Sequence, residues 1–183
     1  MQNTIQVKDL TFKPYLSEAD IQRRIQLLAL QIEQDYQGKN PLFIGVLNGA
    51  FVFIADLLRY CNLDCEISFV KLSSYDGTKS TGEIKQAIGL NEEILGRNLI
   101  IVEDIVDTGK TMSSFITQLE KLQPASIALA SLLFKPSALK HAVKIDYLGF
   151  EIPDLFVIGY GLDYNGIARN LKDIYQLVPA KEQ

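Results

Sequence analysis

Between Ser17 and Gly38, apolar residues recur at spacings of four, three and four, a period typical of one face of an α-helix. Ser17 is followed three positions later by Asp20, and this pair resembles a capping box at the start of a helix. The periodic residues are Ile21, Ile25, Leu28 and Ile32. The pattern predicts an amphipathic helix that ends near Gly38.

Along the rest of the chain, apolar runs alternate with helical segments. Residues 42–47 follow Pro41 as one continuous apolar run, which suits a strand buried on both faces, as in a parallel sheet. The expected strands are 42–47, 66–72, 98–102, 127–134, 147–150 and 156–160, and the further expected helices are 51–60 and 110–122. This alternation predicts an α/β fold with a mainly parallel central sheet flanked by helices. Such sheets bind ligands beyond the carboxyl ends of their strands.

One long stretch has no hydrophobic period. Residues 73–85 are rich in serine, threonine, glycine and charge. A loop of this length in a compact chain is usually a functional lid or a disordered segment. Gly77 and Gly82 would permit hinge motion in a lid, and they would suit disorder equally well.

The composition narrows the class of protein. The 183 residues are 48% hydrophobic and 22% charged, which is typical of one compact domain with a sizeable core, here spanning 1–183. The first 20 residues contain no apolar stretch suited to a signal peptide. No run approaches the roughly 20 apolar residues of a membrane-spanning helix. We therefore expect a cytoplasmic protein that does not contact membranes.

Cysteine, histidine and net charge exclude several kinds of chemistry. The chain has only Cys61, Cys65 and the single histidine His141, which argues against a disulfide framework and against a Cys/His metal site. His141 stands in a polar stretch and is predicted to be solvated, so a Ser-His-Asp mechanism is not expected. A net charge of −4 and a pI near 5.1 would repel a polyanion, so we expect no nucleic-acid partner.

The strongest chemical signal is the segment 99–111. A hydrophobic strand runs into the adjacent carboxylates Glu103 and Asp104, then into Asp107, and finally into Thr-Gly-Lys-Thr at a helix start. Backbone N–H groups at that start, together with two threonine hydroxyls, can form a cradle for a phosphate. The upstream carboxylates can accept hydrogen bonds from sugar hydroxyls or hold a divalent cation. A ribose 5-phosphate accompanied by magnesium fits all of these groups.

Two common phosphate-binding motifs do not fit the chain. A P-loop requires a glycine five positions before Gly109, where the chain has Asp104. The dinucleotide fingerprint fails at Tyr164, which stands where a third glycine would follow Gly159 and Gly161. A short acidic turn alone is equally typical of a capped helix behind a solvated loop. The whole segment is much more specific than that turn.

The residues from Val102 to Thr111 resemble the signature of type I phosphoribosyltransferases, which binds phosphoribosyl pyrophosphate (PRPP). The resemblance covers Leu42 to Leu171 and is closest to the hypoxanthine-guanine branch of that family. The other matching segments are 46–51, 74–75 with 80–85, 133–135, 149–154 and 156–164. Five separate matches in the right order are hard to obtain by chance.

The resemblance implies both a fold and a reaction. The central sheet would carry a small hood formed by the terminal segments. The enzyme would act in purine salvage, transferring the 5-phosphoribosyl group of PRPP to hypoxanthine and guanine to give IMP or GMP and pyrophosphate. Mg2+ would be the cofactor, and the chain would form a homodimer or homotetramer. The stretch 73–85 would be a lid that keeps water from the reacting ribose.

The resemblance also assigns roles around the ribose phosphate. The family positions that match Glu103 and Asp104 bind the ribose hydroxyls and the metal. The positions that wrap the 5-phosphate match Asp107, Thr108, Gly109, Lys110 and Thr111. Asp107 also matches a residue beside purine N7, which makes it the expected catalytic group for proton transfer.

For the purine, Lys135 matches a donor to the exocyclic O6, which implies a preference for 6-oxopurines because an ammonium group can only donate. Phe156 matches a ring that stacks on the base, and Val157 a backbone contact at its edge. Asp163 lies with this purine-binding set and matches a position that helps to hold a second magnesium, so the implied metal ligands are Glu103, Asp104 and Asp163. The implied pyrophosphate-binding residues are Asn48, Gly49, Ser74, Tyr75 and Arg169.

One position departs from the family pattern. The family often has a basic residue where this chain has Asn48, in a turn that contains an unusual cis peptide bond. Asparagine keeps the turn but supplies no charge for pyrophosphate, whereas the backbone role of Gly49 is unaffected. Two alternatives remain open: a phosphoribosyltransferase for xanthine and guanine or for a pyrimidine, and a regulator of the same fold that binds RNA or DNA and senses PRPP.

Overall fold

The structure is a computed structural model that describes residues 4–73, 85–88 and 93–179. The larger sheet is built from β3 (Leu42–Leu47), β4 (Glu66–Ser73), β5 (Lys85–Ile88), β6 (Asn98–Val106), β7 (Ser126–Phe134) and β8 (Tyr147–Glu151). The strand order is β5-β4-β3-β6-β7-β8, and every pair is parallel except β4 with β5. The expected α/β fold with a mainly parallel sheet is confirmed.

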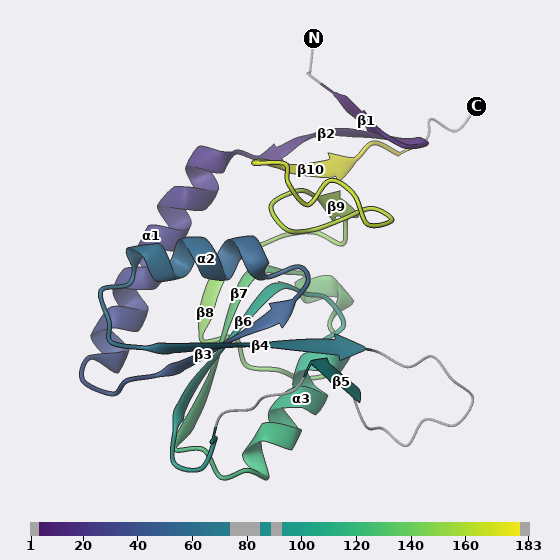
Figure 1. Cartoon of the computed structure of the whole chain (residues 1–183). Coiled ribbons are helices and arrows are strands. Elements are labelled where there is room, and N and C mark those ends of the chain that lie inside the picture. The colour runs from purple at the N-terminus through teal and green to yellow at the C-terminus, as the bar shows by residue number, and fades with distance from the viewer. Residues whose placement is uncertain (1–3, 74–84, 89–92, 180–183) are drawn as a thin grey trace.

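Helices cover both faces of this sheet (Figure 1). The helices α1 (Glu18–Tyr36) and α2 (Phe51–Tyr60) pack on one face, and α3 (Lys110–Glu120) packs on the other. Alternate side chains of β6 point to opposite faces of the sheet. Ile100 and Val102 belong to the hydrophobic cluster under α1 and α2, whereas Leu99 and Ile101 belong to the cluster under α3. Burial on both faces is the reason why the strand is apolar without interruption.

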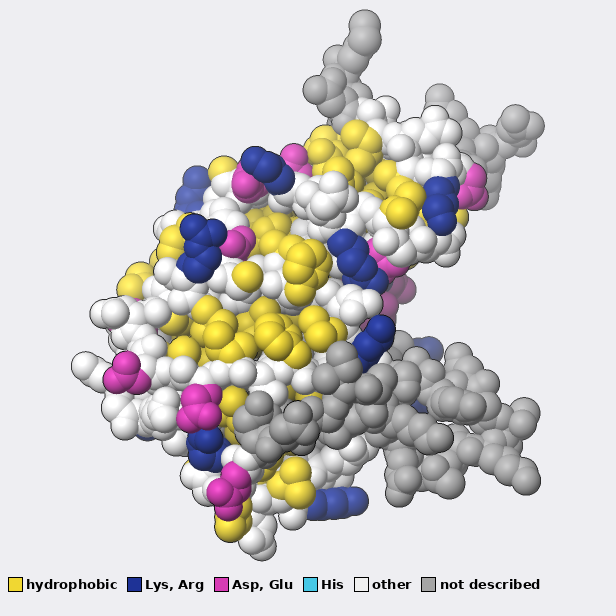
Figure 2. Space-filling model, in the orientation of Figure 1, with side chains coloured by type: hydrophobic (Ala, Val, Ile, Leu, Met, Phe, Trp, Pro, Cys, Tyr) yellow, Lys and Arg dark blue, Asp and Glu magenta, His cyan; other side chains and the backbone are white. Residues whose placement is uncertain are grey.

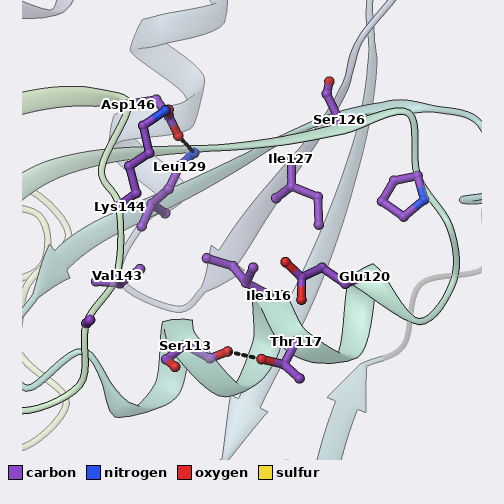
Figure 3. A pocket seen from close by; sticks show the side chains of 12 residues that line it. Ser113, Ile116, Thr117, Glu120, Ser126, Ile127, Leu129, Val143, Lys144 and Asp146 are labelled. Carbon is purple, nitrogen blue, oxygen red and sulfur yellow. Dashed lines mark hydrogen bonds and ion pairs between the residues drawn. The ribbon is translucent and has the colours of Figure 1, made fainter.

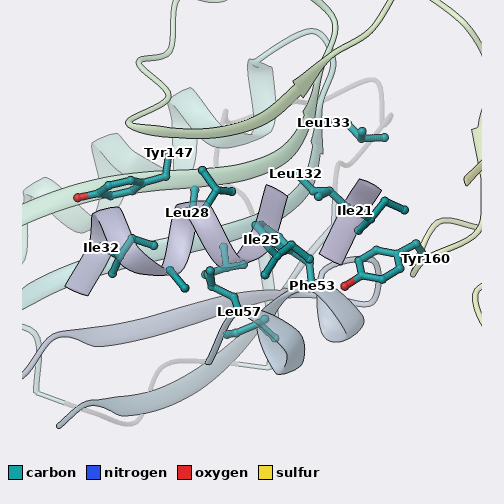
Figure 4. Packing of buried hydrophobic residues seen from close by; sticks show 14 of the residues in the cluster. Ile21, Ile25, Leu28, Ile32, Phe53, Leu57, Leu132, Leu133, Tyr147 and Tyr160 are labelled. Carbon is teal, nitrogen blue, oxygen red and sulfur yellow. The ribbon is translucent and has the colours of Figure 1, made fainter. Parts of the chain in front are cut away.

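The helix α1 forms as its sequence predicts. Ser17 is its N-cap, since its hydroxyl oxygen accepts a hydrogen bond from the backbone N–H of Asp20 at 3.2 Å. The four periodic isoleucine and leucine residues are fully buried against α2 and the sheet (Figure 4). This packing of one apolar face supplies most of the stability of such a helix.

A second, antiparallel sheet lies above the carboxyl edge of the first and contains both terminal segments (Figure 1). Its strands are β1 (Ile5–Val7), β2 (Leu10–Leu16), β9 (Val157–Ile158) and β10 (Ile174–Leu177), in the order β1-β2-β10-β9. This sheet is the hood that the family resemblance implied.

Several predicted bounds need correction. The strand expected at 98–102 continues to Val106, so the acidic pair lies on β6, where Glu103 is paired with Ser131 of β7. The strand expected at 156–160 is wrong beyond Ile158, because positive φ angles from Gly159 to Gly161 end the extended conformation. The helix expected to reach 122 ends at Glu120. The strands β1, β2, β5 and β10 had no counterpart in the prediction. Within the described residues, no helix is long and apolar enough to cross a membrane.

Candidate functional site

The predicted residues gather at the carboxyl edge of the larger sheet, beneath the hood. Asn48 and Gly49 follow β3, Asp107 follows β6, and Lys135 follows β7. Because β3, β6 and β7 are parallel neighbours, these turns meet at one edge of the sheet. Phe156 arrives from the chain after β8, the next strand in the sheet.

The predicted phosphate cradle is the turn between β6 and α3. Gly109 has a φ of +77° and caps α3, whose first N–H groups have no partner within the helix. A side chain at Gly109 would collide with the carbonyl oxygen of His141, so space also requires glycine here. The N–H groups of Lys140 and His141 both donate to the carbonyl of Thr108 at 3.0 Å, which supports the cradle from the chain after β7. The side chain of His141 is exposed, as predicted.

The acidic pair stands next to the cradle in an environment that opposes negative charge. Burial, followed by the neighbouring Asp104 carboxylate, raises the pKa of Glu103 well above its usual range. Burial also raises the pKa of Asp104 to about 6, although the Ile105 N–H and the Arg169 guanidinium oppose that shift. One oxygen of Glu103, Oε2, is buried without a hydrogen-bond partner. Among the described residues, Arg169 offsets only part of the cost of burying charge on this pair.

The turn after β3 lies against this pair. The peptide bond between Leu47 and Asn48 is cis, as the family resemblance implied. A Cβ atom on Gly49 would overlap the carboxylate of Asp104, so the backbone of the turn rests on that side chain. On the hood side, Gly161 packs against the carbonyl of Gly49 so closely that it too has no room for a side chain. The turn is thus enclosed between β6 and the hood.

The hood contributes Arg169 and Asp163 to the same region. The Arg169 guanidinium donates to the carbonyl of Gly161 at 2.6 Å and pairs with Asp163 Oδ1 at 2.6 Å. The other carboxylate oxygen of Asp163 accepts a hydrogen bond from the Gly166 N–H at 2.6 Å. Both predicted residues are therefore near the turn, and each is already engaged by a neighbour.

Lys135 is a buried cation held between two carboxylates. Its side chain is 9% exposed, and Nζ lies 3.3 Å from Asp107 Oδ2 and 3.1 Å from Asp154 Oδ1. Its backbone N–H donates to the carbonyl of Val106 at 3.0 Å, which fixes the residue to the end of β6. An ammonium group has three donors, so one remains after the two ion pairs. Lys135 and Asp107, predicted separately from the sequence, are in direct contact.

Phe156 stands at the entrance to the hood and is 43% exposed. Its ring meets Tyr164 edge-on with centroids 5.9 Å apart, and it lies 6.1 Å from the buried ring of Phe12. Val157, the next residue, starts β9 and is buried. The two neighbours hold the ring while part of it remains accessible for stacking.

The predicted metal ligands do not form one cluster. Within the described ranges, no three His, Cys, Asp or Glu side chains are grouped so that they could hold a metal ion by themselves. Glu103 and Asp104 lie together, whereas Asp163 is bound to Arg169. Mg2+ is often held by one or two carboxylates together with phosphate oxygens of a substrate, and the unpartnered oxygen of Glu103 fits that arrangement.

A pocket of about 530 Å³ lies away from these residues, between α3, the start of β7 and residues 142–146 (Figure 3). Its walls include Ile116, Thr117 and Glu120 of α3 and none of the predicted site residues. Lys144, the lysine on its rim, pairs with Asp146 at 2.6 Å. The candidate site is therefore at the strand ends, where the buried charges and the predicted cradle are found.

Some predicted residues lie outside the described ranges, and some contacts of the site were not predicted. Ser74 and Tyr75, with most of the stretch 73–85, lie outside the described residues. Asp154 was missed: it belongs to a segment that matches the family, but nothing in the sequence indicated its contact with Lys135. The support of the cradle by Lys140 and His141 was missed too, because it depends on backbone atoms that carry no sequence signal.

Comparison with known families agrees with this geometry. The family model of the phosphoribosyl transferase domain matches residues 14–165, so the chain belongs to the phosphoribosyltransferase family. Among curated relatives, the hypoxanthine-guanine phosphoribosyltransferase of Bacillus subtilis is 42% identical over 169 residues, which cover 92% of this chain and 94% of the relative. The chain thus falls within the hypoxanthine-guanine branch, as its motifs predicted.

Solved structures place the chain in the same group. A hypoxanthine-guanine phosphoribosyltransferase from Bacillus anthracis superposes with a TM-score of 0.85 at 38% identity, covering 91% of this chain and 97% of the other. A mutant hypoxanthine phosphoribosyltransferase from Trypanosoma cruzi, complexed with the product IMP, has a TM-score of 0.86 at 34% identity and covers 96% and 95% of the two chains. Similarity of this extent covers the hood as well as the larger sheet.

Proposed function

We propose that this enzyme acts in purine salvage and transfers the 5-phosphoribosyl group of PRPP to hypoxanthine and guanine, giving IMP or GMP and pyrophosphate. The contact that carries the proposal is the one between Lys135 and Asp107 at the mouth of the phosphate cradle. In this contact an ammonium group lies 3.3 Å from a carboxylate oxygen. The ammonium group would donate to a purine O6, and the carboxylate would accept a purine proton. The similar proteins are named as hypoxanthine-guanine and hypoxanthine phosphoribosyltransferases, which supports hypoxanthine and guanine as substrates.

The ribose phosphate would lie across the cradle and the acidic pair. Backbone N–H groups from 108 to 111 would donate to the 5-phosphate, where the positive end of α3 favours negative charge. Glu103 and Asp104 would accept hydrogen bonds from the ribose hydroxyls. This arrangement separates the two kinds of group, because the carboxylates would repel the phosphate that the helix start attracts.

We further propose that Mg2+ binds at Glu103 and Asp104, where its charge would balance the buried carboxylates. When bound, the ion would neutralise charge on the pyrophosphate leaving group. Asp163 stays in the proposal as a ligand of a second ion, which would have to replace its ion pair with Arg169. Isothermal titration calorimetry with Mg2+, in the absence and in the presence of PRPP, measures the binding of the first and the second ion.

The base would occupy the space between Lys135 and Phe156. Phe156 would stack on the purine ring, and the remaining donor of Lys135 would bind O6. Asp107, 47% exposed, is accessible to the base and would take or share the N7 proton as the new bond forms at the ribose. At the opposite side, Gly49 and Arg169 would bind pyrophosphate, with the Asn48 side chain adding no charge.

One assay tests this function directly. Pyrophosphate release from PRPP is measured with hypoxanthine, guanine, xanthine and adenine supplied in turn, with Mg2+ present. We expect turnover with hypoxanthine and guanine and little with adenine. Turnover with none of the four bases would refute the proposal, and tight retention of RNA or DNA in a filter-binding assay would favour the regulator instead.

We also propose that the chain is a homodimer or homotetramer that works in the cytoplasm, with residues 1–183 forming one domain. Apolar side chains gather over α2 and β4 on one face of the molecule (Figure 2). They include Phe51, Ile67 and Phe69, which are 43%, 49% and 38% exposed. We call these three residues the α2–β4 patch. Exposed apolar patches of this kind often mark contacts with another chain, and a second copy could cover this one.

A further inference from the structure

Tyr160 lies in the chain between Val157 and Gly161, but its side chain does not point toward the site. Gly159, Tyr160 and Gly161 have φ angles of +94°, +50° and +99°, so the chain turns sharply at three successive residues. Gly161 rests on the carbonyl of Gly49, whereas the side chain of Tyr160 enters the core under α1 and α2 and is 3% exposed. A non-glycine residue is uncommon in this conformation.

The hydroxyl of Tyr160 ends in a small polar network at the edge of that core, where the Asp56 side chain is 20% exposed and Tyr60 is 41% exposed. It donates to Asp56 Oδ2 at 2.5 Å, and Gln22 Nε2 donates to the same oxygen at 2.5 Å. Gln22 in turn accepts a hydrogen bond from Tyr60 at 3.1 Å. Burial, followed by this hydrogen bond to Asp56, raises the pKa of the Tyr160 phenol, so the group stays protonated and remains a donor. A bond from a buried hydroxyl to a carboxylate is among the stronger hydrogen bonds in proteins.

The network connects two parts of the site that are far apart in sequence. Asp56 belongs to α2, and α2 begins directly after the turn that contains Gly49. The hood segment therefore meets this turn and helix at two points: Gly161 at the turn itself and Tyr160 at Asp56. Arg169 is bonded to Gly161, so its position depends on the same attachment.

We infer that Tyr160 is a positioning residue: its hydrogen bond to Asp56 holds the hood segment, with Gly161 and Arg169, over the turn that is proposed to bind pyrophosphate. The inference rests on the proposed function. The purine side of the site has further attachments of its own. Phe156 also packs on Phe12 of β2, β9 pairs with β10, and Lys135 is fixed to β6. Loss of the Tyr160 hydroxyl should therefore weaken pyrophosphate binding much more than purine binding.

The test is the reverse reaction, from IMP and pyrophosphate, measured with the full chain. Tyr160→Phe keeps the ring in the core and removes the hydrogen bond to the charged Asp56, together with a longer one, 3.4 Å, that the hydroxyl accepts from Gln22 Nε2. We expect the KM for pyrophosphate to rise about tenfold, the scale of one such bond, while the KM for IMP stays within about twofold. Asp56→Ala should reproduce this rise in the KM for pyrophosphate. Asp56→Asn keeps an acceptor oxygen, so its KM should lie much closer to that of the parent. The double variant Tyr160→Phe/Asp56→Ala should have nearly the same KM as either single variant.

A matched control exists in the same core. Tyr147 is buried and donates to Asp35 Oδ2 at 2.7 Å, at the end of the cluster opposite Tyr160 (Figure 4). Tyr147→Phe should lower the melting temperature and leave both KM values at those of the parent. The inference is overturned if Tyr160→Phe changes neither KM, raises both equally, or behaves like Tyr147→Phe. A parent protein with no phosphoribosyl transfer would instead refute the proposed function.

Discussion

Ionisation of Asp104 lowers the stability of the folded protein. Its pKa is raised to about 6, mainly by burial, so the folded protein holds this proton more tightly than the unfolded chain does. Ionisation of Asp104 therefore destabilises the folded state as the pH rises from about 4 through 6, and the penalty is fully present at higher pH. Residues kept for binding charged ligands commonly carry such a penalty.

Asp104→Asn should consequently stabilise the ligand-free protein while impairing catalysis. The amide keeps an oxygen for the Ile105 N–H but removes a buried charge. We expect the free energy of unfolding to rise by about 1–3 kcal/mol at pH 8, with no gain below pH 4, together with weaker PRPP binding. Denaturant unfolding at the two pH values measures this. The exposed Asp64→Asn is the control, and a gain that does not depend on pH would contradict the explanation.

Asp107 is the residue that we expect to move the proton. Asparagine in its place keeps the size and most hydrogen bonds but cannot take a proton from the purine. Asp107→Asn should lower the rate of the chemical step by about 10²–10⁴-fold and change PRPP affinity little. Single-turnover kinetics at saturating PRPP measures that step. A rate within a few-fold of the parent would leave Asp107 with a positioning role only.

Lys135 should determine the preference for 6-oxopurines. Lys135→Ala removes the O6 donor and also leaves Asp107 and Asp154 facing each other without a cation. We expect the KM for hypoxanthine to rise about 10–100-fold and discrimination against adenine to weaken. Steady-state kinetics with both bases tests this, and Lys144→Ala, at an exposed ion pair, is the control. Unchanged selectivity would remove Lys135 from the base site.

At the scale of elements, the decisive junction is the one between β6 and α3. The strand brings the acidic pair to the edge of the sheet, and Gly109 turns the chain into the helix whose first N–H groups are proposed to form the cradle. The same glycine faces the carbonyl of His141, so the position of the cradle depends on the chain after β7. Strand, turn and helix therefore act as one unit.

Gly109→Ala tests that unit. Two effects oppose alanine: a positive φ, which costs about 1–2 kcal/mol, and the collision with His141. Gly96 has a similar φ of +70° with open space around it, so Gly96→Ala shares only the first effect. We expect both variants to lose stability, and only Gly109→Ala to raise the KM for PRPP by tenfold or more. Equal KM values in the two variants would argue against a preformed cradle.

At the scale of the whole molecule, the α2–β4 patch is the surface that we expect a second copy to cover. Phe51 follows the turn at Gly49 by two residues, so a partner seated there would also support the turn that is proposed to bind pyrophosphate. Ile67→Glu, on β4 and distant from the site residues, should shift the protein toward monomer. Analytical ultracentrifugation measures this. Leu122→Glu, at an exposed apolar residue after α3, should leave the mass unchanged, and an unaltered mass for Ile67→Glu would place the interface elsewhere.

The sequence alone predicted the elements whose signals are local. The bounds of β3 and α2 agree with the structure, because a continuous apolar run and a helical period can each be recognised within about ten residues. The segment from Glu103 to Thr111 was recognised for a similar reason, since the acidic pair and the cradle are adjacent in the chain. Chemistry contained in one stretch of sequence can be predicted without knowledge of the fold.

Contacts between distant segments were decided by the tertiary structure alone. The hood pairs β2 with β10, which are more than 150 residues apart, and neither strand has a pattern that indicates its partner. The contacts of Lys135 with Asp154, Gly49 with Asp104, and Tyr160 with Asp56 likewise join separate parts of the chain. Strand order in the sheet and closure of the hood create these contacts. Both depend on packing summed over the whole molecule, which no local stretch of sequence encodes.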